Sequence, residues 1–434
     1  MNENTPHNWF ERADKALPAG GFGNFDNAVM ISHGTGAYVH TTDGRKFIDY
    51  LIGSGPMVLG HGHPEVLEAV HEQLDKGMTF FANSTAGVEL AEEINAALPS
   101  AEQLRYVSTG GEADMYAMRL ARAYTGRSKI VKFEGGYHGM SAEAQMSLAP
   151  TREVNFPQPI PDSAGIPKSV EQDMLIAPFN DMDFITSLFA EYGDEIAGII
   201  VEPLQRIIPP EEGFLACLRQ LCDAHGAVLI FDEVVTAFRF HYNGAQTLYG
   251  VTPDLTTLGK IIGGGFPLAA IAGKKEIMDL FDKKAAGQDP HGQDRWLMQT
   301  GTLSGNPVAS VAGLKTLEIL KRPESLTRLN QMGKRLWQRI DEALSSQGVP
   351  HQMVGHPTLF DVVFSDHPVR NYRDTKSANG AHSALFNRIL REQGILKSPA
   401  KLYPQLALSE ADLIQTEEAI EMAAKAVGQH INSC

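Results

Sequence analysis

An aspartate and a lysine mark the stretch of the sequence that is best suited to chemistry. Asp232 ends the apolar run 227–231, and Lys260 follows 28 residues later, just before the glycines 263–265. Such a run is typical of a central strand in a parallel sheet, and ligands of open α/β folds bind at the carboxyl ends of these strands. Glycines let the backbone come close to a bound molecule. The pair therefore predicts a ligand that is held at both ends.

A glycine turn between a predicted strand at 103–107 and a predicted helix at 112–124 indicates an anion site. The turn consists of Ser108, Thr109, Gly110 and Gly111. The free N–H groups and the positive end of the helix dipole attract anions, and Ser108 or Thr109 can add a hydroxyl donor. Two adjacent glycines are a weak signal by themselves, and the pattern is neither a GxGxxG fingerprint nor a P-loop.

Two further strand ends carry groups that suit a ligand site. The predicted strand 129–133 runs into Tyr137 and His138, and the predicted strand 197–201 ends at Glu202. Tyr137 is either an ordinary loop residue or a ring that stacks on a planar ligand. Glu202 is either a cap or ion-pair partner, or an active-site residue. The residue types alone leave both pairs of alternatives open.

The elements that must position these residues belong to a chain of 434 residues, which exceeds the usual single-core limit. We expect a large domain of roughly 250 residues with smaller terminal lobes. A helix and a glycine-rich turn precede a hairpin at Asp43-Gly44, and Pro64 begins a helix over 65–76. The proline-rich loop 141–170 is a candidate lid. Helices and a short strand at 358–364 suggest an α+β lobe.

The chain is accordingly divided into three segments. Residues 1–60 form an amino-terminal segment that packs with the small domain, residues 61–314 form the large ligand-binding domain, and residues 315–434 form the small domain. The apolar strand runs alternate with helices along the large domain, which predicts an α/β fold with a mostly parallel sheet.

Composition narrows the class of protein. The 37 basic and 52 acidic residues give a net charge of −15, and no basic stripe is present, so nucleic acid is not an expected partner. Cys217, Cys222 and Cys434 are too few and too irregularly spaced for a disulfide framework or a zinc site, and no metal is expected. No signal peptide and no spanning helix are expected. These features predict a cytoplasmic enzyme that does not associate with membranes.

Six motifs in chain order are similar to those of the class III aminotransferases. They are Ser108–Ala113, Tyr137–Gly139, Val201–Pro203, Phe231–Arg239, Leu258–Pro267 and Gly301–Pro307. The resemblance covers roughly residues 15–430, and the most similar branch is that of glutamate-1-semialdehyde aminomutase. It implies a fold type I enzyme that uses pyridoxal 5'-phosphate, with a seven-stranded, mostly parallel sheet in the large domain. The small α+β domain is then formed by the carboxyl-terminal part together with the amino-terminal segment.

The resemblance also implies roles for the two catalytic candidates. Lys260 matches the lysine that forms a Schiff base with the cofactor and then moves the substrate proton. Asp232 matches the acid that pairs with the pyridinium nitrogen, where a charge-assisted hydrogen bond keeps the ring an electron sink.

Further residues are matched to contacts with the cofactor. Val234, two residues beyond Asp232, is expected to point the same way along the strand and press on one ring face, while Tyr137 covers the other. The phosphate is expected to lie at Thr109, Gly110 and Gly111, and His138 and Glu202 are expected nearby. Thr302 matches a phosphate ligand from the neighbouring subunit, so the resemblance implies a homodimer with the active site at the interface.

Departures from the family pattern concern the substrate. Residues 22–29 lack the arginine that holds a substrate carboxylate in the aminomutase branch, and Ser54 lies between glycines where a tryptophan is usual. Gly111 replaces a threonine, which removes a hydroxyl donor. Arg206, just beyond Glu202, is the candidate for carboxylate recognition, because guanidinium groups bind carboxylates bidentately.

The predicted reaction is a transamination in two half-reactions, in which an amine or amino acid donates nitrogen and a keto acid or aldehyde accepts it. The alternative is an aminomutase or epimerase, whose product keeps the nitrogen. The missing arginine argues against the semialdehyde as substrate. A non-catalytic regulatory protein would be expected to carry an added domain or to lack Lys260. A nucleotide-binding enzyme would leave Lys260 without a role.

Overall fold

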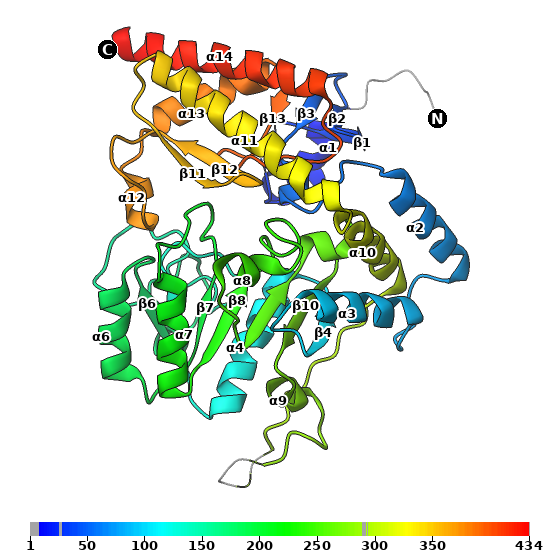
Figure 1. Ribbon diagram of the computed structural model, residues 1–434, viewed down its shortest axis with the longest axis vertical. Helices are drawn as coiled ribbons and strands as arrows, with labels where there is room; N and C mark the ends of the chain where they lie inside the picture. Colours follow the sequence, from blue (N-terminus) through cyan, green and yellow to red (C-terminus); the bar gives the residue numbers. More distant parts are fainter. Residues whose placement is uncertain (1–7, 26–27, 289–291, 293, 434) are drawn as a thin grey trace.

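The computed structural model describes residues 8–25, 28–288, 292 and 294–433, and it consists of two parts, one above the other in Figure 1. The larger part is built around a seven-stranded sheet. The smaller part contains the long helices α11 (Pro323–Ser346) and α14 (Glu410–Ser433). This arrangement confirms the predicted α/β fold with an additional α+β lobe, whereas the boundaries after residues 60 and 314 stay predictions.

The large sheet has the strand order β4-β10-β9-β8-β7-β5-β6. Its strands are β4 (Gln103–Val107), β5 (Lys129–Phe133), β6 (Met174–Ala177), β7 (Ile196–Val201), β8 (Val228–Asp232), β9 (Leu255–Leu258) and β10 (Ala269–Gly273). Strands β5 to β9 pair in parallel, whereas β10 is antiparallel to both of its neighbours, β4 and β9. Every residue of β7 and β8 is buried, as their continuous apolar runs predict for strands covered on both faces.

Helices cover both faces of this sheet. Successive side chains of a strand point to opposite sides, so each buried strand packs against helices on both faces. In β8, Ile230 belongs to the apolar cluster of Leu120 in α4 (Gly110–Thr125), whereas Phe231 belongs to that of Phe214, the first residue of α7. The other helical segments of the large part are α3 (Thr85–Ala97), α5 (Lys168–Glu171), α6 (Met182–Tyr192), α7 (Phe214–His225), α8 (Gly244–Tyr249), α9 (Lys275–Met278), η3 (Lys260–Gly263) and η4 (Asp279–Phe281).

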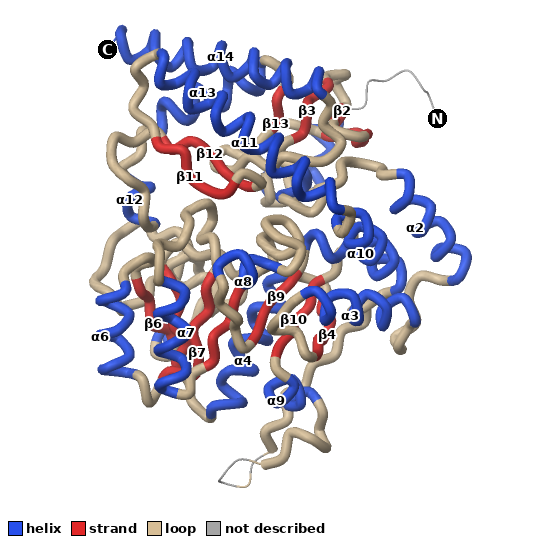
Figure 2. The backbone as a smooth tube through the Cα atoms, viewed as in Figure 1, coloured by secondary structure: helices blue, strands red, loops and turns tan. Residues whose placement is uncertain are grey.

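The small part joins the two ends of the chain in one sheet, which Figure 2 shows beneath the right-hand end of α14. Its order is β1-β2-β3-β13, and the carboxyl-terminal strand β13 pairs in parallel with the amino-terminal β3. The predicted hairpin is confirmed, since Gly44 adopts a φ of 85° between β2 and β3. The elements are β1 (Ile31–Thr35), β2 (Tyr38–Thr41), β3 (Lys46–Asp49), β11 (Gln352–His356), β12 (Leu359–Val363), β13 (Ile395–Leu396), α12 (Tyr372–Lys376) and α13 (Gly380–Glu392).

Two helices, α2 (Pro64–Lys76) and α10 (Pro307–Leu320), pack against each other between the two parts (Figure 1). Pro64 begins α2, as predicted, because its fixed φ suits the first turn of a helix. The amino-terminal segment also contains α1 (Trp9–Ala16), η1 (Pro18–Gly20) and η2 (Ile52–Ser54). Among the described residues, no helix has both the length and the apolar character to cross a membrane.

The loop 141–170 has little regular structure, as predicted, but it is tied to both parts of the molecule. The Lys132 ammonium group donates hydrogen bonds to two carbonyl oxygens of the loop, including that of Met146 at 2.7 Å. Arg373 of α12 donates to the carbonyl oxygen of Val154 at 2.9 Å. The loop is thus held in place from both sides, and its role as a lid stays a prediction.

Candidate active site

The sequence-predicted groups of the large domain meet at the carboxyl edge of the seven-stranded sheet. Asp232 ends β8, Glu202 follows β7, His138 follows β5, and Lys260 lies just beyond β9. The glycine turn that begins α4 lies at the same edge, since a Cβ atom at Gly259 would lie 3.8 Å from the Gly110 Cα. This convergence is the one expected from parallel strands that end together.

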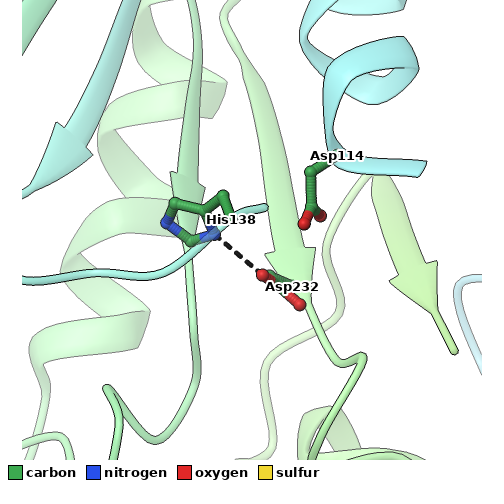
Figure 3. Close-up of side chains that lie close together, drawn as sticks. All are labelled: Asp114, His138 and Asp232. Carbon is green, nitrogen blue, oxygen red and sulfur yellow. Dashed lines mark hydrogen bonds and ion pairs between the residues drawn. The ribbon is translucent and has the colours of Figure 1, made fainter. Parts of the chain in front are cut away.

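A buried histidine orients the carboxylate of Asp232 (Figure 3). The Nδ1 atom of His138 lies 2.8 Å from Oδ2 of Asp232, and the side chains are 1% and 4% exposed. The second oxygen, Oδ1, accepts a hydrogen bond from the backbone N–H of Val234 at 3.1 Å. Asp232 therefore has a fixed orientation that a neighbouring ligand does not need to induce.

A second carboxyl group, which the sequence analysis missed, lies beside this pair. Asp114 projects from α4 toward Asp232 in Figure 3, and its Oδ1 accepts a hydrogen bond from the Thr257 hydroxyl at 2.6 Å. Burial raises the pKa of Asp114 well above its usual value, and the adjacent Asp232 charge raises it further. Both causes favour the protonated form of Asp114. Its position one turn beyond the glycine turn was the available signal, because residues three to four apart share a helix face.

Lys260 occupies an unusual backbone conformation in a crowded site. It has a φ of 51°, a left-handed conformation that costs a non-glycine residue about 1–3 kcal/mol and that is enriched at functional sites. Burial lowers the pKa of its amine, and the nearby Asp232 and Glu202 charges partly oppose this shift. The amine is consequently neutral over a wider pH range than that of an exposed lysine.

Gly55 lies beside the lysine side chain. A Cβ atom at Gly55 would lie 3.4 Å from Cδ of Lys260, 3.4 Å from Cε1 of Tyr403 and 3.7 Å from Nη2 of Arg239. Arg239 is 1% exposed, and it donates a hydrogen bond from Nη2 to the carbonyl oxygen of Gly55. Burial lowers the pKa of Arg239 to about 10, and among the described residues its Nη1 has no hydrogen-bond partner. Arg239 and Tyr403 were not identified as site residues from the sequence.

The start of α4 forms a cradle for an anion. The Glu112 carboxylate accepts the N–H groups of Ser108 and Thr109 at 2.8 and 2.9 Å, while the Thr109 hydroxyl caps the helix. The N–H groups of Gly110 and Gly111 then remain for a ligand, because the first turn of a helix has no intrahelical partners. A Cβ at Gly111 would lie only 3.0 Å from the Gly139 Cα, so the turn fits tightly against the loop after β5.

Val234 lies in the turn after β8, not in the strand. Strand alternation therefore does not apply to Val234, because the chain turns after Asp232, and its contact with one ring face stays a prediction. The Val234 side chain instead borders the cradle, since a Cβ at Gly110 would lie 2.9 Å from its Cγ1.

Tyr137, Glu202 and Arg206 are in contact. Glu202 is buried and accepts a hydrogen bond from the Tyr137 N–H at 2.9 Å. The Arg206 guanidinium lies over the Tyr137 ring, 5.2 Å from its centroid. Arg206 is exposed and has a φ of 61°, in a tight turn between Gln205 and Ile208. Glu202 thus orients the Tyr137 backbone. It acts as a hydrogen-bond partner, and it lies at the same sheet edge as the other site candidates.

Two candidates lie at or beyond the margin of this group. Ser54 is exposed and has a φ of 64° in the left-handed run before Gly55. Thr302 is exposed in the turn before α10, and none of its described contacts is to the residues at the sheet edge. In the segment 22–29, Asp26 and Asn27 lie outside the described residues.

The family model for class III aminotransferases matches residues 23–424. The chain belongs to the class III aminotransferase family. This aminotransferase is 42% identical over 401 residues to glutamate-1-semialdehyde 2,1-aminomutase of Nitratidesulfovibrio vulgaris, which covers 90% of the chain and 92% of that relative. An omega-transaminase from Sphaerobacter thermophilus has a TM-score of 0.90 and 33% identity, covering 98% of both chains. A transaminase solved with pyridoxal phosphate bound has a TM-score of 0.86 and 29% identity, covering 97% of both chains.

The family membership establishes a pyridoxal-phosphate-dependent enzyme of fold type I, as the sequence predicted. The residues at the sheet edge of this aminotransferase fit that cofactor. The oriented carboxylate of Asp232 suits a protonated ring nitrogen, and the buried amine of Lys260 suits an aldehyde. The start of α4 at Gly110 and Gly111 offers the N–H groups without an intrahelical partner that a phosphate requires.

Proposed function

We propose that Lys260 and Asp232 are the catalytic residues and that this aminotransferase moves an amino group from an amine or amino acid to a keto acid or aldehyde in two half-reactions. The proposal depends mainly on one observation, a buried amine with a lowered pKa at the same sheet edge as an oriented carboxylate. A neutral lysine is a nucleophile and a proton acceptor near neutral pH, whereas a protonated lysine is neither.

Each residue has a separate task in this proposal. Pyridoxal phosphate, when bound, supplies an aldehyde that takes up an amine and a ring that withdraws electrons. Lys260 holds the cofactor, and its Nζ atom, once a substrate amine has displaced it, accepts the substrate proton and returns it. Asp232 stabilises the proton on the ring nitrogen through a charge-assisted hydrogen bond, and His138 keeps Asp232 in the required orientation.

The remaining cofactor contacts follow from the positions of the side chains. Gly110 and Gly111 would bind the phosphate through their N–H groups, and the Thr109 hydroxyl would add a donor. Tyr137 and Val234 would border the two faces of the ring. Glu202, through its bond to the Tyr137 N–H, holds that loop in place. Replacing Thr109 by valine should weaken cofactor binding, which equilibrium dialysis of the cofactor measures; unchanged affinity would remove Thr109 from this set.

Recognition of the substrate is assigned to Arg206 and Ser54. Arg206 projects beside the Tyr137 ring, where its fork of donors can bind a substrate carboxylate. Ser54 lies next to Gly55, which contacts the Lys260 side chain, so its hydroxyl is within the region that a substrate would enter. An Arg206→Gln variant should raise KM for amino acids more than for amines without a carboxylate.

A homodimer is part of the proposal, with Thr302 contacting the phosphate in the neighbouring subunit. Its support is that Thr302 is exposed and that large apolar side chains nearby in sequence, Met298 and Leu303, are 62% and 52% exposed. Exposed apolar surface of this kind is typical of protein interfaces. Mixing Lys260→Ala and Thr302→Ala subunits tests it, because each mixed dimer then has one intact site; no recovered activity would contradict the shared site.

A cytoplasmic location is supported by two free cysteines, Cys217 and Cys222.

An aminomutase is the second candidate, because the relative of 42% identity has that name. The segment 22–29 has no arginine or lysine, which favours the transaminase. Adding an amino donor alone distinguishes the two reactions. A transaminase converts one equivalent of donor and then stops, with loss of the visible absorbance band of the bound cofactor. Continuous turnover of a single substrate without an acceptor would establish the aminomutase.

A further inference from the structure

Two basic side chains line one cavity between the large sheet and the small domain. The cavity has a volume of about 570 Å³, and Arg206 and Lys401 contribute to its wall together with Tyr137. Within the part of the chain that the structure describes, neither basic group makes an ion pair or a side-chain hydrogen bond. The Arg206 guanidinium lies over the Tyr137 ring, and the Asp361 carboxylate in the same wall is already paired with Lys397. Unpaired basic groups in a chain of net charge −15 indicate an anionic ligand.

Lys401 is close enough to the catalytic groups for their charges to act on it. Burial lowers the pKa of Lys401 to about 7, and the Arg206 cation contributes to this shift. The Glu202 and Asp232 carboxylates oppose the shift, whereas Lys260 reinforces it. Near neutral pH the empty site therefore has a permanent cation, Arg206, and a second group that gains a proton when an anion arrives.

The cavity wall combines polar residues, among them Gln205, Asp361 and Asn379, with apolar residues from three separate segments. The loop 141–170 contributes Leu148, the turn after Arg206 contributes Ile207, and β12 with the residue after it contributes Val363 and Phe364. A volume of this size accommodates a small-molecule ligand. A side chain that enters this space would exchange water for aliphatic and aromatic contacts, which favours apolar groups by roughly 25 cal/mol for each Å² that is buried.

We propose that Arg206 and Lys401 together bind the substrate carboxylate, and that the adjoining cavity receives a large aryl or branched aliphatic group, so that the preferred substrates are amino acids with such a side chain. This inference rests on the proposed function, because it needs the reacting amine to lie near Lys260. It assigns Lys401, 141 residues beyond Lys260 in the sequence, as a substrate-binding residue.

Binding of 3-phenylpropanoate, which has the carboxylate and the ring but no amine to react, tests the proposal. Isothermal titration of the holoenzyme at pH 8, in two buffers of different ionisation enthalpy, gives the affinity and the number of protons taken up. We expect uptake of about one proton for each ligand bound, because Lys401 is mostly neutral at this pH in the empty site. Propanoate, which lacks the ring, should bind at least about tenfold more weakly.

Variants separate the charge of Lys401 from its titration. Lys401→Met and Arg206→Gln should each weaken binding of 3-phenylpropanoate at least about tenfold. Lys401→Arg should keep most of the affinity but lose the proton uptake, because a guanidinium is always charged. Lys425→Met, a change at an exposed lysine on α14, is the matched control and should change neither quantity.

The outcomes also separate this inference from the proposed function. Equal affinities in the wild type and Lys401→Met, absence of proton uptake, or equal binding of propanoate and 3-phenylpropanoate would overturn the inference. All of these can be measured while the visible absorbance of the cofactor confirms that each variant is folded and loaded. Attachment of the cofactor to a lysine other than Lys260 would instead overturn the proposed function.

Discussion

His138 and Asp232 form a buried pair in which Nδ1 of the histidine lies 2.8 Å from Oδ2 of the aspartate. The other carboxylate oxygen is held by the backbone of Val234 at 3.1 Å. The acid at the end of β8 is thus oriented by the protein itself, which removes part of the cost of ordering it when a ligand binds. Burial and the Asp232 charge raise the pKa of the neighbouring Asp114, which disfavours a second negative charge in the site.

The two acids should respond differently to the same substitution. Asp232→Asn removes the charge that stabilises the ring proton, and we expect kcat to fall roughly 10²–10³-fold, as for other single electrostatic contacts in active sites. The raised pKa of Asp114 favours its protonated form, and Asp114→Asn substitutes a neutral group of similar shape, so we expect kcat to stay within a few-fold of the wild type. Steady-state kinetics of both variants provides the measurement. Equal losses would show that Asp114 is ionised or acts directly in catalysis.

The close contact between the anion cradle and the loop after β5 predicts a strong effect of one methyl group. In Gly139→Ala, the added Cβ would lie 2.3 Å from the Gly111 Cα, and the backbone has a φ of 86°. We expect the cradle to be displaced and cofactor affinity to fall at least about tenfold, with lower stability.

Gly126 provides the matched control for this change. It has a φ of 72° at the end of α4, and a Cβ there meets nothing within 4 Å. Gly126→Ala should therefore cost only about 1–2 kcal/mol of backbone strain and leave cofactor affinity unchanged. Titration of the apoenzyme with pyridoxal phosphate compares the two variants. Similar affinities in both would mean that the Gly111–Gly139 contact does not shape the cradle.

Lys132 predicts a dependence of stability on pH. It is fully buried in β5, and burial lowers its pKa to about 7 from a usual value of 10.5. Between pH 7 and 10 the unfolded chain therefore holds a proton at Lys132 that the folded protein lacks. By linkage, this group makes the folded state more stable as pH rises, by at most about 1.4 kcal/mol per pH unit, and the contribution levels off below pH 7.

Lys132→Met has no such titration, so the wild type should gain stability relative to the variant as pH increases. Thermal midpoints of both proteins at pH 7.5, 8.5 and 9.5 measure the difference. The variant also loses the bonds that Lys132 donates to the loop 141–170, and it should show faster proteolysis there. A difference in midpoint that stays constant across these pH values would contradict the lowered pKa.

Local patterns were sufficient to predict the strand that ends at Asp232 and the turn at Gly110, because an apolar run and a strand–glycine–helix sequence each determine their own geometry. The placement of Val234 in this strand was wrong, because the strand ends two residues before it. Lys401 and Arg239 could not be predicted as site residues. Lys401 reaches the site through the packing of the small domain against the large sheet, and the sequence has no signal for such a contact.

The attachment of the cofactor to Lys260 tests the central claim most directly. Borohydride reduction of the holoenzyme, followed by digestion and mass spectrometry, locates the lysine that carries the reduced cofactor. We expect the added mass on the peptide that contains Lys260, and no added mass in Lys260→Ala. A reduced cofactor on Lys132, Lys401 or any other lysine would contradict the assignment of Lys260 as the catalytic residue.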